Sequence, residues 1–205
     1  RLESCEACTI ADTLISDVTG GAGGSAPYVV APAGQGVGLK ISGGTVALNR
    51  VQVKGVTGGR SGNTMTCVDS CASFSVRVGA GIGVQLLDGA QVSADHLRLS
   101  ELRGGTGGLA EKNSSGFGNV HLGGQALGVQ LQSSSLALSH LTVAELKGGT
   151  SYVEQGLGGA QAVHVGALAD SHNVQLDHVI VSGVSGGDVE DGVWCLWSDS
   201  GNALS

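Results

Sequence analysis

The chain has 205 residues, of which 37 are glycine, whereas aromatic residues make up 3% and charged residues 13%. A core must therefore be built from Val, Leu, Ile and Ala, and this composition excludes a disordered chain. The net charge of −7 and the total of 10 Lys and Arg residues argue against nucleic acid as a partner, because a phosphate-binding surface needs clustered basic side chains. No run of about 18 apolar residues is present, so the sequence predicts no membrane span.

A short strand with alternating apolar residues recurs along the chain. Its copies span residues 36–41, 81–86, 127–131, 162–165 and 192–197. Alternation of this kind predicts a strand with one buried face. Aligning the copies predicts two inward-facing columns of side chains. The first contains Val37, Ile82, Leu127, Val163 and Val193, and the second contains Leu39, Val84, Val129, Val165 and Cys195.

A second pattern follows the first in each complete repeat, and a degenerate copy lies near the start of the chain. Its copies span residues 8–15, 46–53, 92–99, 136–143 and 174–181. In the copy at 46–53 the apolar residues alternate up to Leu48 and then resume with the opposite phase at Val51. This change indicates that the chain turns a corner while its apolar side chains keep pointing inward.

Each repeat then ends in the same way. A step of three residues, as from Val53 to Val56, marks a further bend, and a Gly-Gly pair follows. The pairs stand at 20–21, 58–59, 104–105, 148–149 and 186–187. Three short strands separated by bends, repeated about every 40 residues, predict an all-β, parallel β-helix (β-solenoid).

The repeat resembles a known group of proteins. It has the form G-V-x-L, followed by [VL]-x-[LA]-[NDS]-[HR]-[VL]-x-[VL]-x-x-[VL]-x-G-G. This form is similar to bacterial right-handed parallel β-helix repeat proteins of the pectate-lyase-like superfamily, and more narrowly to Gly-rich, adhesin-like surface proteins. The resemblance covers nearly the whole chain and implies a right-handed β-solenoid of about five coils with Gly-rich protruding loops. It implies little about function, because the superfamily includes lyases, glycosidases, phage tailspikes and non-catalytic adhesins.

Stacking the repeats predicts two polar columns at the corner. One contains Asn49, Asp95, Ser139 and Asp177, and the column beside it contains Arg50, His96, His140 and His178, with Asp12 beneath. Short polar side chains at a corner hydrogen-bond backbone amides that the bend leaves unpaired. Imidazoles spaced about 5 Å apart are also potential metal ligands. We interpret the columns as a structural corner ladder of stacked rings, and we predict no metal and no cofactor.

The chain has five cysteines. They are Cys5, Cys8, Cys67, Cys71 and Cys195. The first four form two close pairs and are candidates for disulfides in a secreted protein. A four-thiolate zinc site and free core thiols are the alternatives. Cys195 is left over and falls at a predicted core position.

Variable loops connect each Gly pair to the next first strand, and we expect any binding of surface glycans or other proteins to occur there. One loop, at 59–81, contains Cys67 and Cys71, and another, at 105–125, contains the sequon-like Asn113. The acidic run Asp188, Glu190 and Asp191 has the ligand type that Ca²⁺ prefers. We interpret that run as a solvated loop.

The repeat continues to both ends of the sequence, which predicts a single solenoid domain over residues 1–205 that is uncapped at both ends. Uncapped coils expose unpaired strand edges. Two explanations follow: the chain is a section of a longer repetitive protein, or copies of it stack end to end into a fibre. Either way, we predict a secreted or cell-surface scaffold, structural or adhesive, that is not an enzyme.

The alternative function is a carbohydrate-active β-helix enzyme, either a polysaccharide lyase or a glycoside hydrolase. Such chemistry needs closely paired carboxylates, or an acidic cluster with a base. Asp95 and Asp177 share a column but lie two coils apart, so they do not form such a pair. The nearest approach to a cluster is Asp170, His172 and Asp177.

Overall fold

Strands are the regular secondary structure of the described part of the chain. The computed structural model describes residues 1–24, 32–62, 75–76, 78–108, 120–121, 123–151, 158–165, 173–188 and 202–204, which contain strands and no helix. The strands are β1 (Leu2–Ala11), β2 (Leu14–Thr19), β3 (Gly36–Asn49), β4 (Gln52–Thr57), β5 (Ser75–Val76), β6 (Gly81–Leu87), β7 (Gln91–Arg103), β8 (Val120–His121), β9 (Ala126–Leu131), β10 (Ser135–Lys147), β11 (Ala160–Val165), β12 (Val174–Ser185) and β13 (Asn202–Leu204). Within these ranges, no helix offers the length and apolarity that crossing a membrane requires.

Every pairing between these strands is parallel. Eleven strands form one sheet, whose main path runs β12-β10-β7-β3-β6-β9-β11-β13, and β5 pairs with β8 in a separate small sheet. The long strand β3 joins the two halves of this path, because its first part pairs with β6 and its second part pairs with β7. The prediction of an all-β fold with parallel strands is confirmed, and the arrangement is compatible with a β-solenoid.

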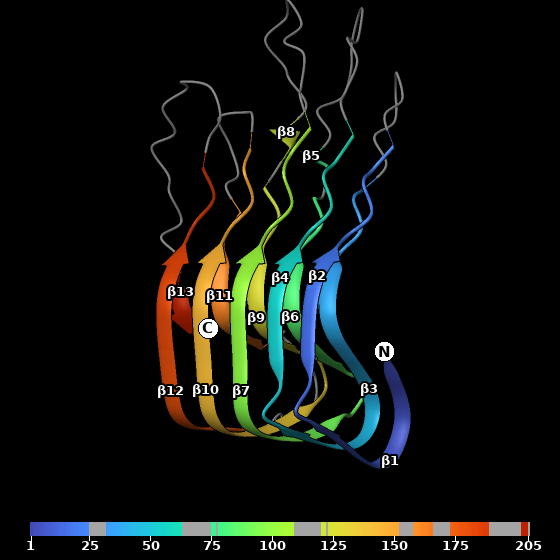
Figure 1. Cartoon of the computed structure of the whole chain (residues 1–205). Coiled ribbons are helices and arrows are strands. Elements are labelled where there is room, and N and C mark those ends of the chain that lie inside the picture. The colour runs from blue at the N-terminus through green and yellow to red at the C-terminus, as the bar shows by residue number, and fades with distance from the viewer. Residues whose placement is uncertain are drawn as a thin grey trace, which may run out of the picture.

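The strands fall into five repeats that lie side by side in Figure 1. Repeat 1 contains β1 and β2, repeat 2 contains β3 and β4, repeat 3 contains β6 and β7, repeat 4 contains β9 and β10, and repeat 5 contains β11 and β12. Strands β6, β9 and β11 lie behind β4, β7 and β10 in this view. Each repeat pairs with the next through equivalent residues, so one sequence position recurs as a column along the sheet.

The corner between the two apolar phases is made by one residue in the left-handed conformation. This residue is Asp12, Arg50, His96, His140 or His178 in repeats 1 to 5, with φ between +50° and +60°. A left-handed residue reverses the direction of the following side chains, which accounts for the change of phase in the sequence. The second bend, at the three-residue step, uses the same device. Its left-handed residues are Asp17, Gly55, Glu101, Glu145 and Gly183.

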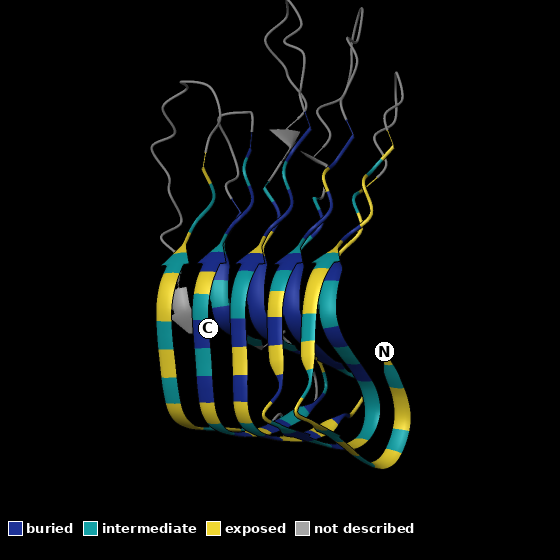
Figure 2. Ribbon diagram, in the orientation of Figure 1, coloured by how far each residue is buried: buried dark blue, intermediate teal, exposed yellow. Residues whose placement is uncertain are grey.

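The core consists of aliphatic columns enclosed by the sheet. One column passes through Val53, Leu99 and Val143, each of which has no exposed surface. Its two ends are Ile15 and Val181, in repeats 1 and 5, and these side chains are only partly buried. Figure 2 shows the same gradient, from dark blue in the middle repeats to teal and yellow at both ends.

The predicted alignment of the first strand is wrong in repeat 5. Val163 pairs with Val129 and not with Leu127, and Val165 pairs with Leu131. A shift by two residues keeps the same side chains on the same face, so alternation alone does not fix the register. On the other side of β11, Leu204 pairs with Val163 in the place predicted for Val193. Val193 and Cys195 themselves lie outside the described residues.

Beyond the strands, glycines form one continuous chain of backbone hydrogen bonds, which we call the glycine chain. The amide of each member donates to the carbonyl oxygen of the member before it, over N–O distances of 2.7–3.3 Å. The members are Gly21, Gly34, Gly59, Gly79, Gly105, Gly124, Gly149, Gly158 and Gly187. From Gly59 onward, a methyl group on any member would overlap the carbonyl oxygen of the glycine two places earlier. Close backbone approach therefore explains these glycines.

The segments that leave the sheet also hydrogen-bond to one another through their backbones. Successive bonds are three residues apart along each segment, whereas the repeat along a strand is two residues. The amides of Gly20 and Gly23 donate to the carbonyl oxygens of Thr57 and Arg60. The next segments repeat the three-residue spacing, beginning with the bond from the amide of Gly58 to the carbonyl oxygen of Arg103. Bonds at every third residue match an extended chain with three residues per turn, whereas a strand has a period of two. Beyond the sheet, the backbone segments therefore continue side by side as extended chains with three residues per turn.

Replacing Gly149 by alanine tests the glycine chain. The new methyl group would overlap the backbone of Gly105, so we expect the free energy of unfolding to fall by about 1–3 kcal/mol. Gly159→Ala is the matched control, because a methyl group there meets nothing within 4 Å. Urea titration of both variants makes the comparison, and equal stabilities would contradict the close packing of the glycine chain.

Candidate functional site

The polar side chains of the corner lie in two adjacent columns. The strand register places Asn49, Asp95, Ser139 and Asp177 opposite one another. The next residue along the chain is the left-handed one, which carries the second column of Arg50, His96, His140 and His178. Because these residues belong to different repeats, only the parallel register brings them together.

Three imidazole rings are stacked along the second column. The ring centroids of His96 and His140 are 4.4 Å apart with an interplanar angle of 14°. Those of His140 and His178 are 4.9 Å apart with an angle of 16°. All three side chains are about half exposed or more, so one edge of each ring faces solvent.

Carboxylates in the first column hold the rings. Nδ1 of His96 lies 2.9 Å from Oδ2 of Asp95, and Nδ1 of His140 lies 3.1 Å from its Oδ1. The hydrogen bonds to Asp95 lower its pKa, and the bond from His96 has the larger effect. The carboxyl group of Asp95 is therefore ionised at neutral pH. An ionised carboxylate only accepts hydrogen bonds, so Nδ1 is the donor in both rings. His178 makes the equivalent contact with Asp177 at 2.9 Å.

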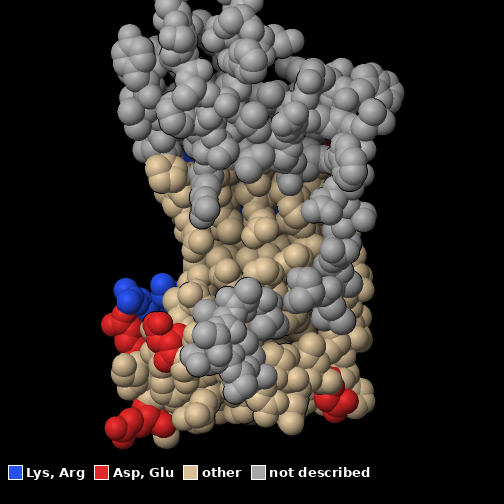
Figure 3. All heavy atoms as spheres, turned by 180° about the vertical axis from the view of Figure 1, so that it is seen from behind, with Lys and Arg blue, Asp and Glu red and all other residues tan. Residues whose placement is uncertain are grey.

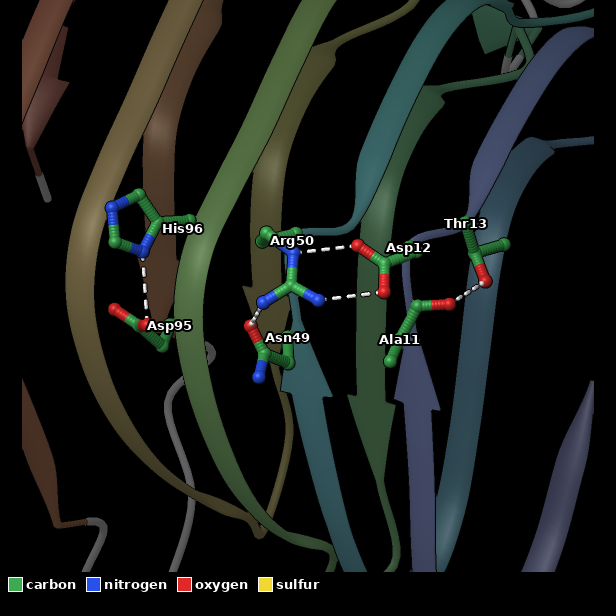
Figure 4. A network of polar contacts seen from close by, with 7 residues as sticks. All are labelled: Ala11, Asp12, Thr13, Asn49, Arg50, Asp95 and His96. Carbon is green, nitrogen blue, oxygen red and sulfur yellow. Dashed lines mark hydrogen bonds and ion pairs between the residues drawn. The ribbon is translucent and has the colours of Figure 1, made fainter.

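In repeats 1 and 2 an ion pair takes the place of the stacked rings. Arg50 donates from Nε to Oδ1 of Asp12 over 2.5 Å and from Nη2 to Oδ2 over 2.6 Å, and it also donates to Oδ1 of Asn49 over 3.2 Å. Figure 4 shows this network beside His96 and Asp95. The hydrogen bond from Arg50 lowers the pKa of Asp12, and that of Arg50 is raised in turn. We refer to Asp95, His96, His140, Asp177 and His178 together as the histidine corner.

A shallow groove of about 620 Å³ runs beside the histidine corner. Its floor includes a column of outward-facing side chains from the strands after the corner. This column contains Leu14, Gln52, Arg98, Thr142 and Ile180. Leu14 and Ile180, at the two ends of the column, are 61% and 64% exposed.

A second polar column lies on the opposite side of the molecule and was not predicted. Gln85 is 7% exposed and donates from Nε2 to Oε1 of Gln130 over 2.9 Å. His164 is next in this column, and its Nδ1 lies 2.6 Å from Oε1 of Gln161. In Figure 3, which is turned to this side, the visible described atoms are mostly uncharged. The sequence signal for the column is the recurrence of Gln at the same strand position.

The remaining predicted site residues are only partly described. Cys5 and Cys8 form a disulfide, with Cα atoms 5.9 Å apart. Asp188 pairs with Lys147 on the neighbouring repeat. The other candidates lie outside the described residues, namely Cys67, Cys71, Asn113, Asp170, His172, Glu190 and Asp191.

Known proteins offer no guide to the role of this site. No family model, curated protein or solved structure matches the chain.

Substituting Arg50 tests the ion pair at the base of the corner. In Arg50→Gln we expect the pKa of Asp12 to rise toward that of an ordinary aspartate, since its main hydrogen-bond donor is lost. The stabilisation from a lowered aspartate pKa is present above the unfolded-state pKa and is lost as pH falls through the folded-state pKa. The change in stability should therefore appear only above strongly acidic pH, and it should be small because both side chains are exposed.

Carboxyl ¹³C NMR titration measures this pKa directly. Arg98→Gln is the control, because Arg98 lines the same groove without contacting Asp12. An Asp12 pKa that is the same in the wild type and in Arg50→Gln would show that the ion pair does not form in solution.

Proposed function

We propose that the chain is a stretch of right-handed parallel β-solenoid that acts as an extracellular scaffold, structural or adhesive, without catalysis. Handedness is supported by a general rule, since about 98% of connections between parallel strands of one sheet are right-handed. The Cys5–Cys8 disulfide supports an oxidising, extracellular location. The proposed role is passive: backbone pairing gives rigidity, and the Gly-rich segments outside the sheet carry any specific binding.

The observation that carries the proposal is the parallel pairing of equivalent strands across all five repeats, which has a register shift only between Cys5 and Cys8 among the pairings of the long strands. The pairing between β7 and β10 and that between β10 and β12 extend from before the corner to the end of each strand. A repeat in such a stack buries its apolar side chains only against its neighbours. The arrangement therefore supports a rod whose length depends on the number of repeats.

Both ends of the described stack leave strands without a further neighbour, although β13 already pairs with β11 beyond repeat 5. Repeat 1 and repeat 5 each leave a row of core side chains only partly buried. The rows are Leu2, Cys8, Ile10, Ile15 and Val18 at one end, and Val174, Leu176, Val179, Val181 and Val184 at the other. Among the described strands, β12 has a neighbour on one side only, and so do β1 and β2. Open edges of this kind pair readily with further strands.

The outward-facing column beside the groove also favours extension. Leu14 and Ile180 occupy the same column position in repeats 1 and 5, where they are the exposed large hydrophobic residues of the described chain. If another unit continued the register, its Leu14 would lie beside Ile180. We propose that further repeats, from the same polypeptide or from a second copy, cover both ends.

Sedimentation velocity and electron microscopy of the 205-residue chain test this proposal. We expect association that increases with concentration and particles of constant width and variable length. In Ile180→Lys, a buried apolar contact would be replaced by a charge, so we expect association to weaken by about tenfold or more.

The matched control is Thr142→Lys, which adds the same charge in the same column but within the stack. We expect this variant to associate like the wild type. A wild-type chain that stays monomeric at all concentrations, or equal effects of the two substitutions, would contradict the proposal. The intact mass of the native protein then distinguishes a long repetitive chain from stacked copies.

A further inference from the structure

The histidine corner presents a row of imidazole nitrogens with unshared electron pairs. Asp95 accepts the Nδ1 protons of His96 and His140, and Asp177 accepts that of His178. In the neutral form of each ring the single proton is then on Nδ1, and Nε2 carries an unshared electron pair. A histidine that binds a metal nearly always donates its other ring N–H to a carboxylate or carbonyl in this way. The three rings therefore have the tautomer and the partner that metal ligation requires.

We propose that His96 and His140, oriented by Asp95, bind one divalent transition-metal ion of the Zn²⁺, Ni²⁺ and Cu²⁺ class through their Nε2 atoms. Water completes the coordination shell, because both side chains face solvent. Imidazole selects these ions, whereas Ca²⁺ and Mg²⁺ prefer oxygen ligands. The site goes beyond a scaffold role and does not depend on end-to-end association.

The distances fit an ion shared between neighbouring repeats. Two nitrogens on a tetrahedral Zn²⁺ lie about 3.4 Å apart, given Zn–N bonds of about 2.1 Å. The ring centroids of His96 and His140 are 4.4 Å apart and the rings are nearly parallel, so their Nε2 atoms must approach by about 1 Å. Both rings must also turn out of the stack, because the Nε2 electron pair lies in the ring plane and both pairs must point at the ion. Half-exposed side chains can make this movement while Asp95 holds the inner edges.

The same reasoning favours this pair over the next one in the column. His140 and His178 are 4.9 Å apart, and their Nδ1 atoms contact two different carboxylates. By contrast, a single carboxylate orients both rings of the first pair.

Two of the nearby charges favour a cation, whereas Arg98, which lines the same groove, opposes it. Asp95 places a negative charge directly behind the two rings. The nearest cation in the column, Arg50, is neutralised by its two hydrogen bonds to Asp12. The left-handed backbone conformation of His96 and His140 places both side chains at the same position of neighbouring repeats.

Isothermal titration calorimetry with Zn²⁺ tests the site on the whole chain. We expect binding to the wild type and a loss of affinity of at least about tenfold in His140→Ala and in His96→Ala. Asp95→Asn keeps the size of the side chain but removes its charge, and we expect a loss of about tenfold. His164→Ala is the matched control, because His164 lies in the other polar column with Gln161 as its partner. Its affinity should equal that of the wild type.

Thermal unfolding provides a second readout that also reports on folding. Zn²⁺ should raise the Tm of the wild type and of His164→Ala, because a ligand that binds only the folded state stabilises it. It should not raise the Tm of His140→Ala, which without metal should unfold cooperatively. Equal Zn²⁺ affinity in the wild type and His140→Ala, or no Zn²⁺ binding by the wild type, would overturn the proposal.

Discussion

Backbone hydrogen bonds between successive repeats are the constraint on which the rest of the structure depends. They hold equivalent residues about 4.8 Å apart, so every sequence position becomes a column. Inside the sheet this constraint requires aliphatic side chains at each level, as in the column through Val53, Leu99 and Val143. Where the segments leave the sheet, the backbones approach so closely that only glycine fits at the members of the glycine chain from Gly59 onward. The unusual composition of the chain is a consequence of this one geometry.

The same constraint would place like charges opposite one another wherever a charged residue recurred at one position of the repeat. In the column of Asp95 the sequence avoids this electrostatic repulsion. Asp95 is flanked in its column by Asn49 and Ser139, so neither adjacent repeat has a carboxylate at that column position. Like charges directly opposite one another destabilise a sheet, whereas a neutral neighbour can share hydrogen bonds with the column. In the second column the imidazoles stack, and Asp95 and Asp177 lie beside them. The proposed metal site uses the same two rings and the same carboxylate, and metal binding would exchange the stacking of His96 and His140 for coordination.

The sequence predicted the all-β parallel fold and both bends, because a change of apolar phase leaves a visible mark. It did not predict the pairing of Val163 with Val129, since alternation with a period of two is unchanged by a shift of two residues. Nor did it predict the glycine chain, which depends on backbone contacts between segments far apart in sequence. The columns of the corner followed from the repeat, but the sharing of Asp95 by two rings required side-chain geometry.

The central claim is that equivalent positions of successive repeats form one straight column, and electron–electron distances test it most directly. Thr9, Ala47, Ser93, Ala137 and Gln175 occupy such a column. Spin-labelled amino acids would be incorporated at Thr9 together with Ser93, Ala137 or Gln175, and the distance within each pair measured by double electron–electron resonance. The account predicts that each additional repeat lengthens the distance by about 5 Å. Distances that do not increase steadily from Ser93 to Gln175 would contradict the in-register stack.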